Sequence, residues 1–503
     1  MTGLALLGLI MLVVMIGAIF IGFPISFTLL FLAFAFGYFG LGGHTVFDLA
    51  YFQTIGMMKE ELLAAVPLFI FMGFVVEQAG LMERLFSAFR ILLAPVRGAL
   101  FLVVILTATI FAMATGIVGA AVTVLGIMAS PIMVKTGYDA QLSAGTITAG
   151  GTLGILIPPS VMLIVMGPVL GVSVADLYAA AFGPGFLLAG IYVGYLMIRS
   201  FVNPKLGPPI PKAERVHGLG TILKGCVVGI LPLAGLIAAT LGSILAGLAT
   251  PTEASGMGAL GAIVLAAAYR KLTLGGVKRA LLSTLATSSM VLLLAVTSNI
   301  FGAVFARLGT ANWITEALVS LPLPPVVMLI VIVVLIFLLG WPFEWPAVIL
   351  VFLPIFYPVA DALKPQLGAL LGIAPDLVMV WFGTVVAVTL QTAYLSPPVA
   401  MSAYYLKQVV KDWSLATIYK GMFQFMLLQI VAIALIIAFP AIATAFPEYL
   451  QKVARETPVE QVEDKVRLED YADEYTDRAN EATRDAQEEA LEQKDQPEAE
   501  PPK

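Results

Sequence analysis

Two pairs of adjacent prolines, Pro158-Pro159 and Pro397-Pro398, lie in the middle of long apolar segments of the sequence. Because proline has no amide hydrogen and its ring clashes with the preceding turn, each pair is expected to break a helix. Backbone groups freed at membrane depth are costly unless they bind something. Freed carbonyls suit Na⁺, and the N-terminus of a half-helix suits a carboxylate. The alternative is that the prolines only kink membrane helices.

Neutral oxygen-bearing residues and glycines surround both breaks, and such groups fit a hard monovalent cation bound without full countercharge. Near the first break they are Thr146, Thr148, Gly150, Gly151, Thr152, Gly154 and Ser160, and near the second Thr384, Thr389, Gln391, Thr392, Ser396 and Ser402.

Glu344 lies in a Gly- and Pro-rich turn that reads Gly-Trp-Pro-Phe-Glu-Trp-Pro from residue 340 to residue 346. A carboxylate inside a membrane is a functional candidate by default. Three roles stay open for it: binding an ion, carrying a proton, or accepting hydrogen bonds from amides freed by Pro342 and Pro346. Whether Trp341, Trp345 and Trp381 anchor the interface or line a pocket also stays open.

The composition indicates what positions these groups. The 503 residues are 60% hydrophobic and 12% charged, with a mean hydropathy of +0.98, which predicts a polytopic all-α integral membrane protein. No positive region or cleavage site accompanies the first apolar run, so we expect a retained span rather than a signal peptide. About ten spans are expected, at 3–20, 24–41, 62–79, 142–170, 175–199, 222–240, 252–269, 280–305, 376–406 and 421–446.

Two further stretches, 99–134 and 324–360, each contain two apolar limbs around a tight turn. Each limb has about 15–18 residues, which is marginal for crossing a hydrocarbon layer of ~30 Å. The limbs are therefore either full spans or re-entrant hairpins, the latter being permitted where the backbone is buried in protein.

Basic residues in short loops predict the orientation. With these spans the clusters at 84–97, 199–224, 270–279 and 407–420 all fall on one side, which is expected to be cytoplasmic. Both termini then lie outside the cytoplasm. The chain carries 18 acidic and 8 basic residues from residue 448 onward, so the end reads as a solvated helix or disordered appendage, with a merely solubilising role as the alternative.

The two halves resemble each other. Asp139 precedes the first proline pair by 19 residues, and Asp376 precedes the second by 21. Five expected crossings in each half would make the second copy enter from the opposite face, giving inverted repeats. Chance similarity is the alternative.

Other chemistry is poorly represented. One cysteine, Cys226, and two histidines exclude a disulfide framework and argue against histidine-rich metal sites. No nucleotide-binding or hydrolytic motif appears, so transport would be driven by an ion gradient or a partner. The residues from Thr250 to Glu253 form a capping box that a structural role explains. A central chain of buried acids is missing, which favours Na⁺ over H⁺.

Over residues 1–446 the chain resembles the large permease subunit (DctM-like) of tripartite ATP-independent periplasmic (TRAP) transporters. The motifs that carry the resemblance are GFPI at 22–25, PLFIFMG at 67–73, GILIPPS at 154–160 and ATPTEA at 249–254. The resemblance implies an ion-transporter-like elevator fold, Na⁺ symport of an organic acid anion, a bacterial inner-membrane location, and no enzyme activity. It implies a small four-helix membrane subunit (DctQ-like) and a periplasmic substrate-binding protein (DctP-like) as partners, and no nucleic acid.

The resemblance also implies where ligands bind. Sodium is expected near Thr115, Gly119, Thr152 and Pro158, and again near Gly340, Glu344, Thr392 and Pro397. The substrate is expected beside Thr152, Ser160, Ser396 and Val399. The chain departs from the family pattern at two points: the first turn reads Thr-Gly-Ile-Val-Gly where the family is usually serine-rich, and the second break reads Ser-Pro-Pro-Val-Ala instead of Thr-Pro-Pro-Val-Gly.

The expected organisation alternates scaffold and transport parts. Scaffold helices and an arm helix occupy 1–98, the first transport half 99–171, further scaffold and a second arm helix 172–323, and the second transport half 324–410. The last span occupies 411–447 and the acidic tail 448–503. The alternatives are a stand-alone ion-coupled anion carrier of related fold, a membrane enzyme or assembly scaffold, and, less favoured, a channel.

Overall fold

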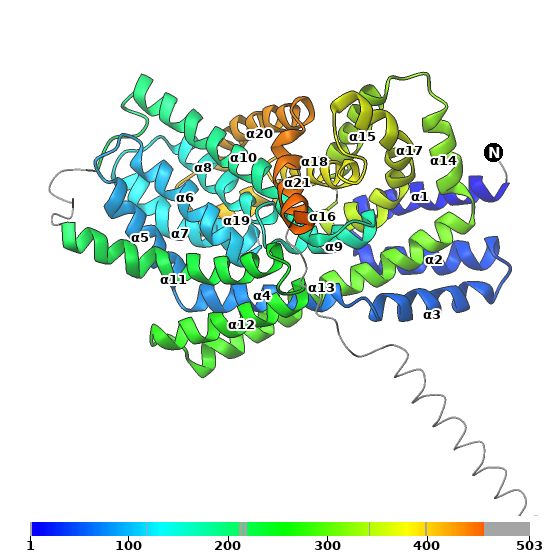
Figure 1. Cartoon of the computed structure of the whole chain (residues 1–503), viewed down its shortest axis with the longest axis horizontal. Coiled ribbons are helices and arrows are strands. Elements are labelled where there is room, and N and C mark those ends of the chain that lie inside the picture. The colour runs from blue at the N-terminus through cyan, green and yellow to red at the C-terminus, as the bar shows by residue number, and fades with distance from the viewer. Residues whose placement is uncertain are drawn as a thin grey trace, which may run out of the picture. The chain divides into compact units, whose positions relative to one another are not determined.

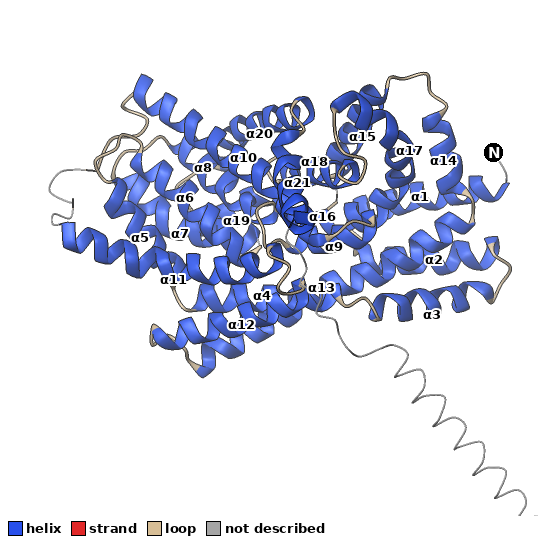
Figure 2. Cartoon of the chain, viewed as in Figure 1, coloured by secondary structure: helices blue, strands red, loops and turns tan. Residues whose placement is uncertain are grey.

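The computed structural model describes residues 3–116, 118–210, 215, 219–341, 343–397 and 400–456. Met1–Glu448 forms one compact unit, and Tyr449–Lys503 forms a second. The secondary structure of the described residues is helical (Figure 2). In the first half the helices are α1 (Gly3–Ile21), α2 (Ile25–Gly40), α3 (Thr45–Met58), α4 (Leu62–Gln78), α5 (Leu81–Leu93), α6 (Ala99–Thr115), α7 (Val118–Lys135), α8 (Ala140–Thr152), α9 (Val161–Leu170) and α10 (Val174–Val202).

The second half continues after a loop with α11 (Leu219–Leu245). The other helices are α12 (Pro251–Ala268), α13 (Leu274–Arg307), α14 (Thr310–Val319), α15 (Pro325–Leu339), α16 (Trp345–Ala347), α17 (Leu353–Leu371), α18 (Val378–Ala393), α19 (Met401–Val409), α20 (Leu415–Ala438) and α21 (Ala441–Glu456). A 3₁₀ turn (Leu153–Ile155) follows α8, and a π-helical turn (Val348–Phe352) joins α16 to α17.

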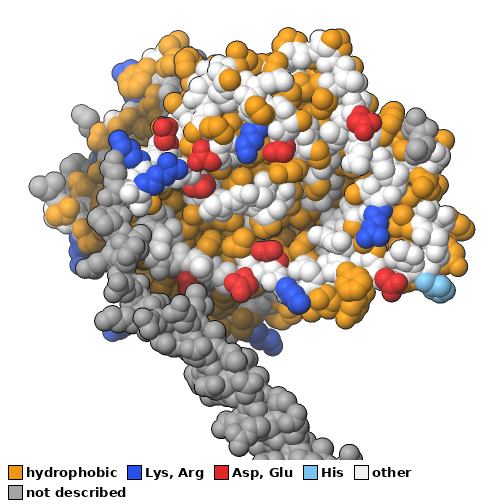
Figure 3. Space-filling model, turned by 45° about the vertical axis from the view of Figure 1, so that its right-hand side comes forward, with side chains coloured by type: hydrophobic (Ala, Val, Ile, Leu, Met, Phe, Trp, Pro, Cys, Tyr) orange, Lys and Arg blue, Asp and Glu red, His pale blue; other side chains and the backbone are white. Residues whose placement is uncertain are grey.

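Seven of the described helices are long and apolar enough to cross a membrane alone, and an eighth crossing results if the bent pair α4–α5 counts as one span. The structure thus supports a multi-span helical protein but not the finer number of ten. The reason lies in the interruptions, because pieces such as α9, with 10 residues, are too short to pass as spans by themselves. Figure 3 shows hydrophobic side chains over much of the face in view, with scattered charged ones between them.

Two expected segments have different boundaries. Helix α3 forms within 42–61, where the sequence analysis expects only a connection, and it lies along α2 and α13 (Figure 1). The last expected span, 421–446, is divided because α20 ends at Ala438 and Pro440 precedes the start of α21.

The two halves follow the same order of elements. In each half a glycine with positive φ, Gly80 (66°) or Gly309 (77°), starts a short helix, α5 or α14, just before a helical hairpin. The hairpins are α6–α7 and α15–α17, and each is followed by an interrupted helix, α8–α9 or α18–α19. Each half therefore has the same sequence of elements: a short helix, two helices joined at a turn, and a helix interrupted at the proline pair.

The halves also interlock. Helix α19 of the second half packs against α7 of the first, and α9 of the first half packs against the π-helical turn and α17 of the second. Glycine permits the close approach of α7 and α19, because a Cβ at Gly126 would lie 2.9 Å from the Leu406 side chain. Each half-helix is thus held against the hairpin of the other half.

Other helices surround this interlocked group. Helix α12 packs along α4, and α13 runs along α2, α3 and α4. Helix α20 packs along α8 through glycine, because a Cβ at Gly145 would lie 2.7 Å from the Gly421 carbonyl oxygen. At the base of the first hairpin, the Leu100 amide donates a hydrogen bond of 3.2 Å to the Tyr138 hydroxyl, and burial raises the pKa of Tyr138 to about 12.

Candidate functional site

The first break is completely enclosed. Helix α8 begins with the Asp139 carboxylate accepting a hydrogen bond of 2.8 Å from the Leu142 amide, and its polar residues point into the protein. All residues from 151 to 160 are buried. The Ser160 hydroxyl bonds to the Ile155 carbonyl, and the Tyr178 hydroxyl donates to the Ser160 carbonyl at 3.3 Å. These bonds hold the break in one conformation.

The second break is less enclosed. Helix α18 ends at Ala393 and α19 begins at Met401, while Pro397 is half-buried. The Ser396 hydroxyl donates to the Thr392 carbonyl at 2.7 Å, and the Leu395 amide donates to the same carbonyl at 3.0 Å. Val399, an expected substrate contact, lies outside the described residues.

Each hairpin tip lies against the break that follows it. Gly116 has a φ of 61°, and a Cβ there would lie 3.8 Å from the Gly154 carbonyl oxygen. In the second half, a Cβ at Gly340 would lie 2.8 Å from the Ala393 side chain, one residue beyond Thr392. In both halves, therefore, the hairpin tip and the break that follows it lie close together. Thr115 ends α6, but its side chain lies outside the described atoms.

A central cavity of about 260 Å³ lies where both halves meet two neighbouring helices. It receives α4 and α13 on one side and the tips of both hairpins on the other. Its described lining is Ile70, Gly116, Val118, Gly119, Ile155, Val161, Thr287, Met290, Val291, Glu344, Trp345, Pro346, Tyr394, Met401 and Tyr405.

The polarity of this cavity is unusual for an anion site. Its described lining contains no Lys or Arg, and its only ionisable carboxyl group is that of Glu344. Two helix N-termini reach it instead, at Val161 of α9 and Met401 of α19. Neither helix has a side-chain cap on its first amides, so both retain hydrogen-bond donors for a negatively charged ligand.

The structure brings only some of the expected site residues to this cavity. Gly119 and Glu344 line it, whereas the side chains of Thr152, Ser160, Thr392 and Ser396 are buried beside it. Gly119 contacts the other half, because a Cβ there would lie 3.0 Å from the Tyr405 ring.

Pro158 is buried within the first break, and Gly340 lines a smaller pocket of about 30 Å³ behind Glu344. Of the expected sodium ligands, Gly119 and Glu344 line the central cavity, and the other described ones lie outside its lining.

Sequence reasoning missed three polar lining residues. Tyr394 and Tyr405 flank the second break, and Thr287 comes from the middle of α13. Tyr394 carries a local signal, because it is a polar aromatic residue close to a proline pair. Thr287 carried no local signal, because its position depends on how α13 packs.

One hydrogen bond joins the two interrupted helices directly. The Gln391 amide nitrogen donates to the Thr152 hydroxyl at 3.1 Å, and both side chains are fully buried. The Thr152 hydroxyl itself donates to the Ala149 carbonyl at 2.8 Å. The other amide atom, Gln391 Oε1, is buried without a hydrogen-bond partner among the described atoms, a situation that costs about 1–3 kcal/mol.

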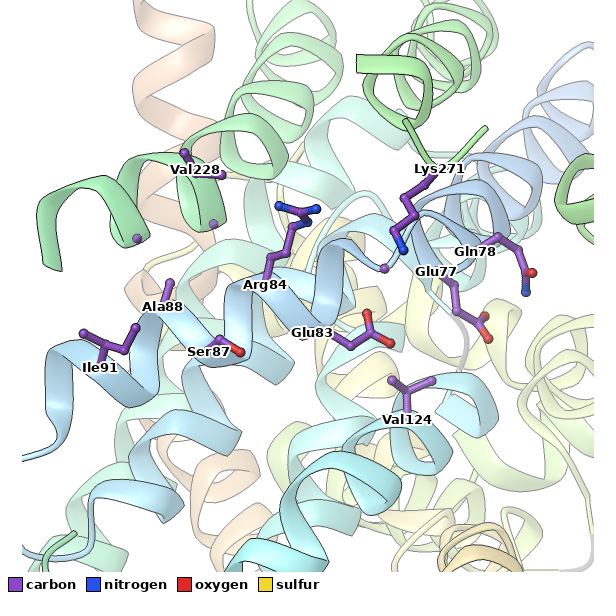
Figure 4. A pocket seen from close by; sticks show the side chains of 13 residues that line it. Glu77, Gln78, Glu83, Arg84, Ser87, Ala88, Ile91, Val124, Val228 and Lys271 are labelled. Carbon is purple, nitrogen blue, oxygen red and sulfur yellow. The ribbon is translucent and has the colours of Figure 1, made fainter. Parts of the chain in front are cut away.

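A larger cavity of about 800 Å³ lies away from the breaks, between α5, α7 and α11 (Figure 4). It is lined by two acids, Glu77 and Glu83, and two bases, Arg84 and Lys271. The Arg84 guanidinium lies 4.5 Å from the centre of the Tyr269 ring. Helices α4 and α7 line both cavities, since Glu77 follows Ile70 by about two helical turns on α4, or ~10 Å.

Known proteins match most of the chain. The family model for the "Tripartite ATP-independent periplasmic transporter, DctM component" matches residues 12–442. The sialic acid TRAP transporter large permease protein SiaM of Vibrio cholerae is 29% identical, covering 86% of this chain and 96% of the relative. The C4-dicarboxylate TRAP transporter large permease protein DctM of Rhodobacter capsulatus is also 29% identical, covering 78% and 88%.

A solved structure has the same fold. The crystal structure of the Alcanivorax borkumensis YdaH transporter matches with a TM-score of 0.56 over 80% of this chain and 89% of its own. Its sequence identity is 17%, so this likeness concerns the fold alone. The family match extends from α1 into α21 and includes both hairpins and both breaks. The chain therefore belongs to the DctM family, the large permeases of TRAP transporters, and is a multi-pass membrane permease rather than an enzyme.

Proposed function

We propose that this permease imports an organic acid anion together with Na⁺. The observation that carries the proposal is the central cavity, where the uncapped N-termini of α9 and α19 meet. Backbone amides at helix N-termini bind carboxylates well. Because the described lining supplies no basic side chain, a bound anion would gain further stabilisation from a co-transported cation.

The sodium ions would bind at the two breaks. Thr152 and Pro158 belong to the first site together with the adjoining hairpin at Thr115 and Gly119. Thr392, Pro397, Gly340 and Glu344 belong to the second. The proximity of Gly116 to Gly154, and of Gly340 to Ala393, supports these pairings. The substrate would lie between them, near Thr152, Ser160 and Ser396.

The mechanism would be that of an elevator built from inverted repeats. Such a transporter would have about ten membrane crossings in addition to the two hairpins. The interlocked hairpins and half-helices would move as one body against α4 and α13, which line the other side of the cavity. The cavity's position between these two groups supports this division, because relative motion would carry a ligand across the barrier.

The partners proposed are a small four-helix membrane subunit and a periplasmic binding protein. The family is by its description part of a tripartite system, and the two relatives are named large permease proteins. Those relatives are named for sialic acid and for C4-dicarboxylates, and both ligand types are acids. A carboxylate is therefore the substrate class that fits the cavity's helix N-termini.

The conformation would be open toward the cytoplasm. The 800 Å³ cavity contains Arg84 and Lys271 from clusters expected on that side, and it shares α4 and α7 with the central cavity. On the side of the second hairpin the adjoining pocket measures only about 30 Å³. A release route carrying both signs of charge would suit the exit of an anion and a cation.

A labelling experiment tests this orientation. Val124→Cys, introduced after Cys226→Ser, is expected to react with a membrane-impermeant thiol reagent in inside-out vesicles and not in right-side-out vesicles. Ile127→Cys is the matched control, because Ile127 is 56% exposed on the same helix but lines neither cavity and would face lipid. Labelling of Val124→Cys only from the periplasmic side would contradict the inward-open assignment.

Uptake by proteoliposomes tests the function itself. They would contain this chain and its small subunit, with a panel of organic acids, and with or without an inward Na⁺ gradient and the binding protein. We expect uptake only when both Na⁺ and the binding protein are present. Uptake without the binding protein would favour a stand-alone carrier. Na⁺-independent uptake would overturn the sodium sites. Single-channel conductance would indicate a channel.

A further inference from the structure

The inference concerns Gln391, whose side chain connects the two interrupted helices. Its amide nitrogen donates to Thr152 across 239 residues of sequence. Gln391 lies beside Thr392 in the last turn of α18, and Thr152 is the last residue of α8. The hydrogen bond thus joins the two points from which the breaks begin.

Neighbouring polar residues behave differently. The hydroxyl groups of four threonines on α8 and α18 donate to carbonyls of their own helix, one turn earlier. They are Thr146, Thr148, Thr384 and Thr389. Among the described side chains of the two interrupted helices, Gln391 and Thr152 alone form a hydrogen bond between the halves. Hydrogen bonding within the helix therefore accounts for the threonine hydroxyls but not for the Gln391 amide.

A purely structural role also fits Gln391 poorly. Its Oε1 atom is buried without a partner in the described structure, so an apolar side chain of the same length would avoid an unfavourable burial. The Thr152 hydroxyl uses its proton on Ala149, which leaves a lone pair free to accept from Gln391. The Gln391 side chain therefore connects the two helices although its carbonyl oxygen has no hydrogen-bond partner among the described atoms.

We propose that Gln391 is a positioning residue that couples the two breaks, so that ion binding at one break favours ion binding at the other. This inference rests on the proposed sodium sites. Because Thr152 and Thr392 both belong to those sites, a rigid link between their helix ends makes a displacement at one break felt at the other. Coupling of this kind requires two sites and a shared element that both bias.

The experiment measures the initial rate of uptake as a function of Na⁺ concentration in proteoliposomes with the complete transporter. The variants are Gln391→Met, which keeps the length and removes the donor, Thr152→Val, which removes the acceptor, and their combination. We expect each single variant to lower the Hill coefficient for Na⁺ toward 1 and to raise the half-saturating Na⁺ concentration by about fivefold or more, a typical coupling between sites. The double variant should be no worse than either single one.

Matched controls separate coupling from general damage. Thr240→Val and Thr284→Val remove buried hydroxyls that bond only within their own helices and lie outside both breaks, and both should keep the wild-type Hill coefficient. Thr152→Ser retains the acceptor and should restore cooperative Na⁺ dependence. If Gln391→Met misfolds, Gln391→Leu tests the same bond, because it also lacks the donor and leaves Thr152, a proposed sodium ligand, in place.

The outcomes distinguish the two proposals. Wild-type uptake without Na⁺ dependence would overturn the proposed function and with it this inference. Cooperative Na⁺ dependence in wild type that persists unchanged in Gln391→Met and Thr152→Val would overturn the coupling role alone. Equal loss of cooperativity in Thr240→Val would also overturn it, because the effect would then follow from any lost buried hydroxyl.

Discussion

The two interrupted helices differ in how completely the protein encloses them. Every residue from 156 to 160 in the first break is buried, and its hydroxyl and carbonyl groups are bonded to one another and to Tyr178. In the second break Tyr394 and Pro397 are only half-buried. The hairpin beside the second break also contributes Glu344 to the central cavity.

This difference teaches that repeated elements need not share their tasks equally. The first half supplies a closed, internally bonded frame, whereas the second half supplies the acid and both tyrosines of the cavity wall. We therefore expect substitutions that remove the internal hydrogen bonds of the first break to lower stability, and those of the cavity-lining residues of the second half to lower transport.

The largest effect is expected for Glu344→Gln. Because Glu344 is the only acid among the described residues that line the central cavity, its neutralisation removes the negative charge available to a cation there. Uptake should fall to the level of protein-free liposomes, measured with the Na⁺ gradient and binding protein present. Asp361→Asn is the control, since Asp361 is an exposed acid on α17 and lines neither cavity. Near-normal uptake by Glu344→Gln would remove this residue from the mechanism.

The hairpin tips offer a sharper comparison. In Gly340→Ala the new Cβ would lie 2.8 Å from Ala393, so we expect uptake to fall by roughly ten- to a hundredfold through displacement of the tip. Adding Ala393→Gly should restore most of the uptake, because the obstruction is a single methyl group. A double variant no better than Gly340→Ala would show that the contact is not the cause.

The first hairpin should respond differently to the same change. Gly116→Ala meets no atom closer than 3.8 Å, but its φ of 61° is strained for alanine by about 1–2 kcal/mol. We expect a lower free energy of unfolding, measured by thermal unfolding in detergent. No second substitution to a smaller residue should restore it, because the strain lies in the backbone at residue 116. An unchanged unfolding temperature would contradict the expected strain.

Losses of stability in the same range are expected at the two serines. Ser160→Ala takes the hydroxyl from the buried Ile155 carbonyl and should lower the free energy of unfolding by about 1–3 kcal/mol. Ser396→Ala should cost less, because the Thr392 carbonyl still accepts from the Leu395 amide. The same thermal unfolding assay compares them, and a larger loss in Ser396→Ala would reverse the assignment of the first break as the more rigid one.

Much of the fold could be predicted because its signals are local. Proline pairs and glycine turns act within a few residues, so the positions of the breaks and hairpins follow from sequence. The number of spans could not be predicted in the same way. Hydropathy alone does not reveal that α3 is a separate helix or that Pro440 divides the last segment.

The candidate site was only partly predictable, for a related reason. Glu344 and Gly119 stand out as an acid and a glycine in apolar turns, and both line the cavity. Thr287 and Tyr405 reach the same cavity from helices 118 positions apart in the chain, so their convergence depends on tertiary packing. The partner of Gln391 was hidden in the same way, since Thr152 lies in the other half of the chain.

The glycine contact between α8 and α20 has a further consequence. At the contact of Gly145 with Gly421 the two backbones touch, so sliding would bring a residue with a side chain to a place where only glycine fits. If the first interrupted helix moves during transport, α20 must move with it. The distance between spectroscopic probes on α20 and on α12, which packs along α4, would then measure the size of the movement. The distance between probes on α20 and on α8 would stay constant.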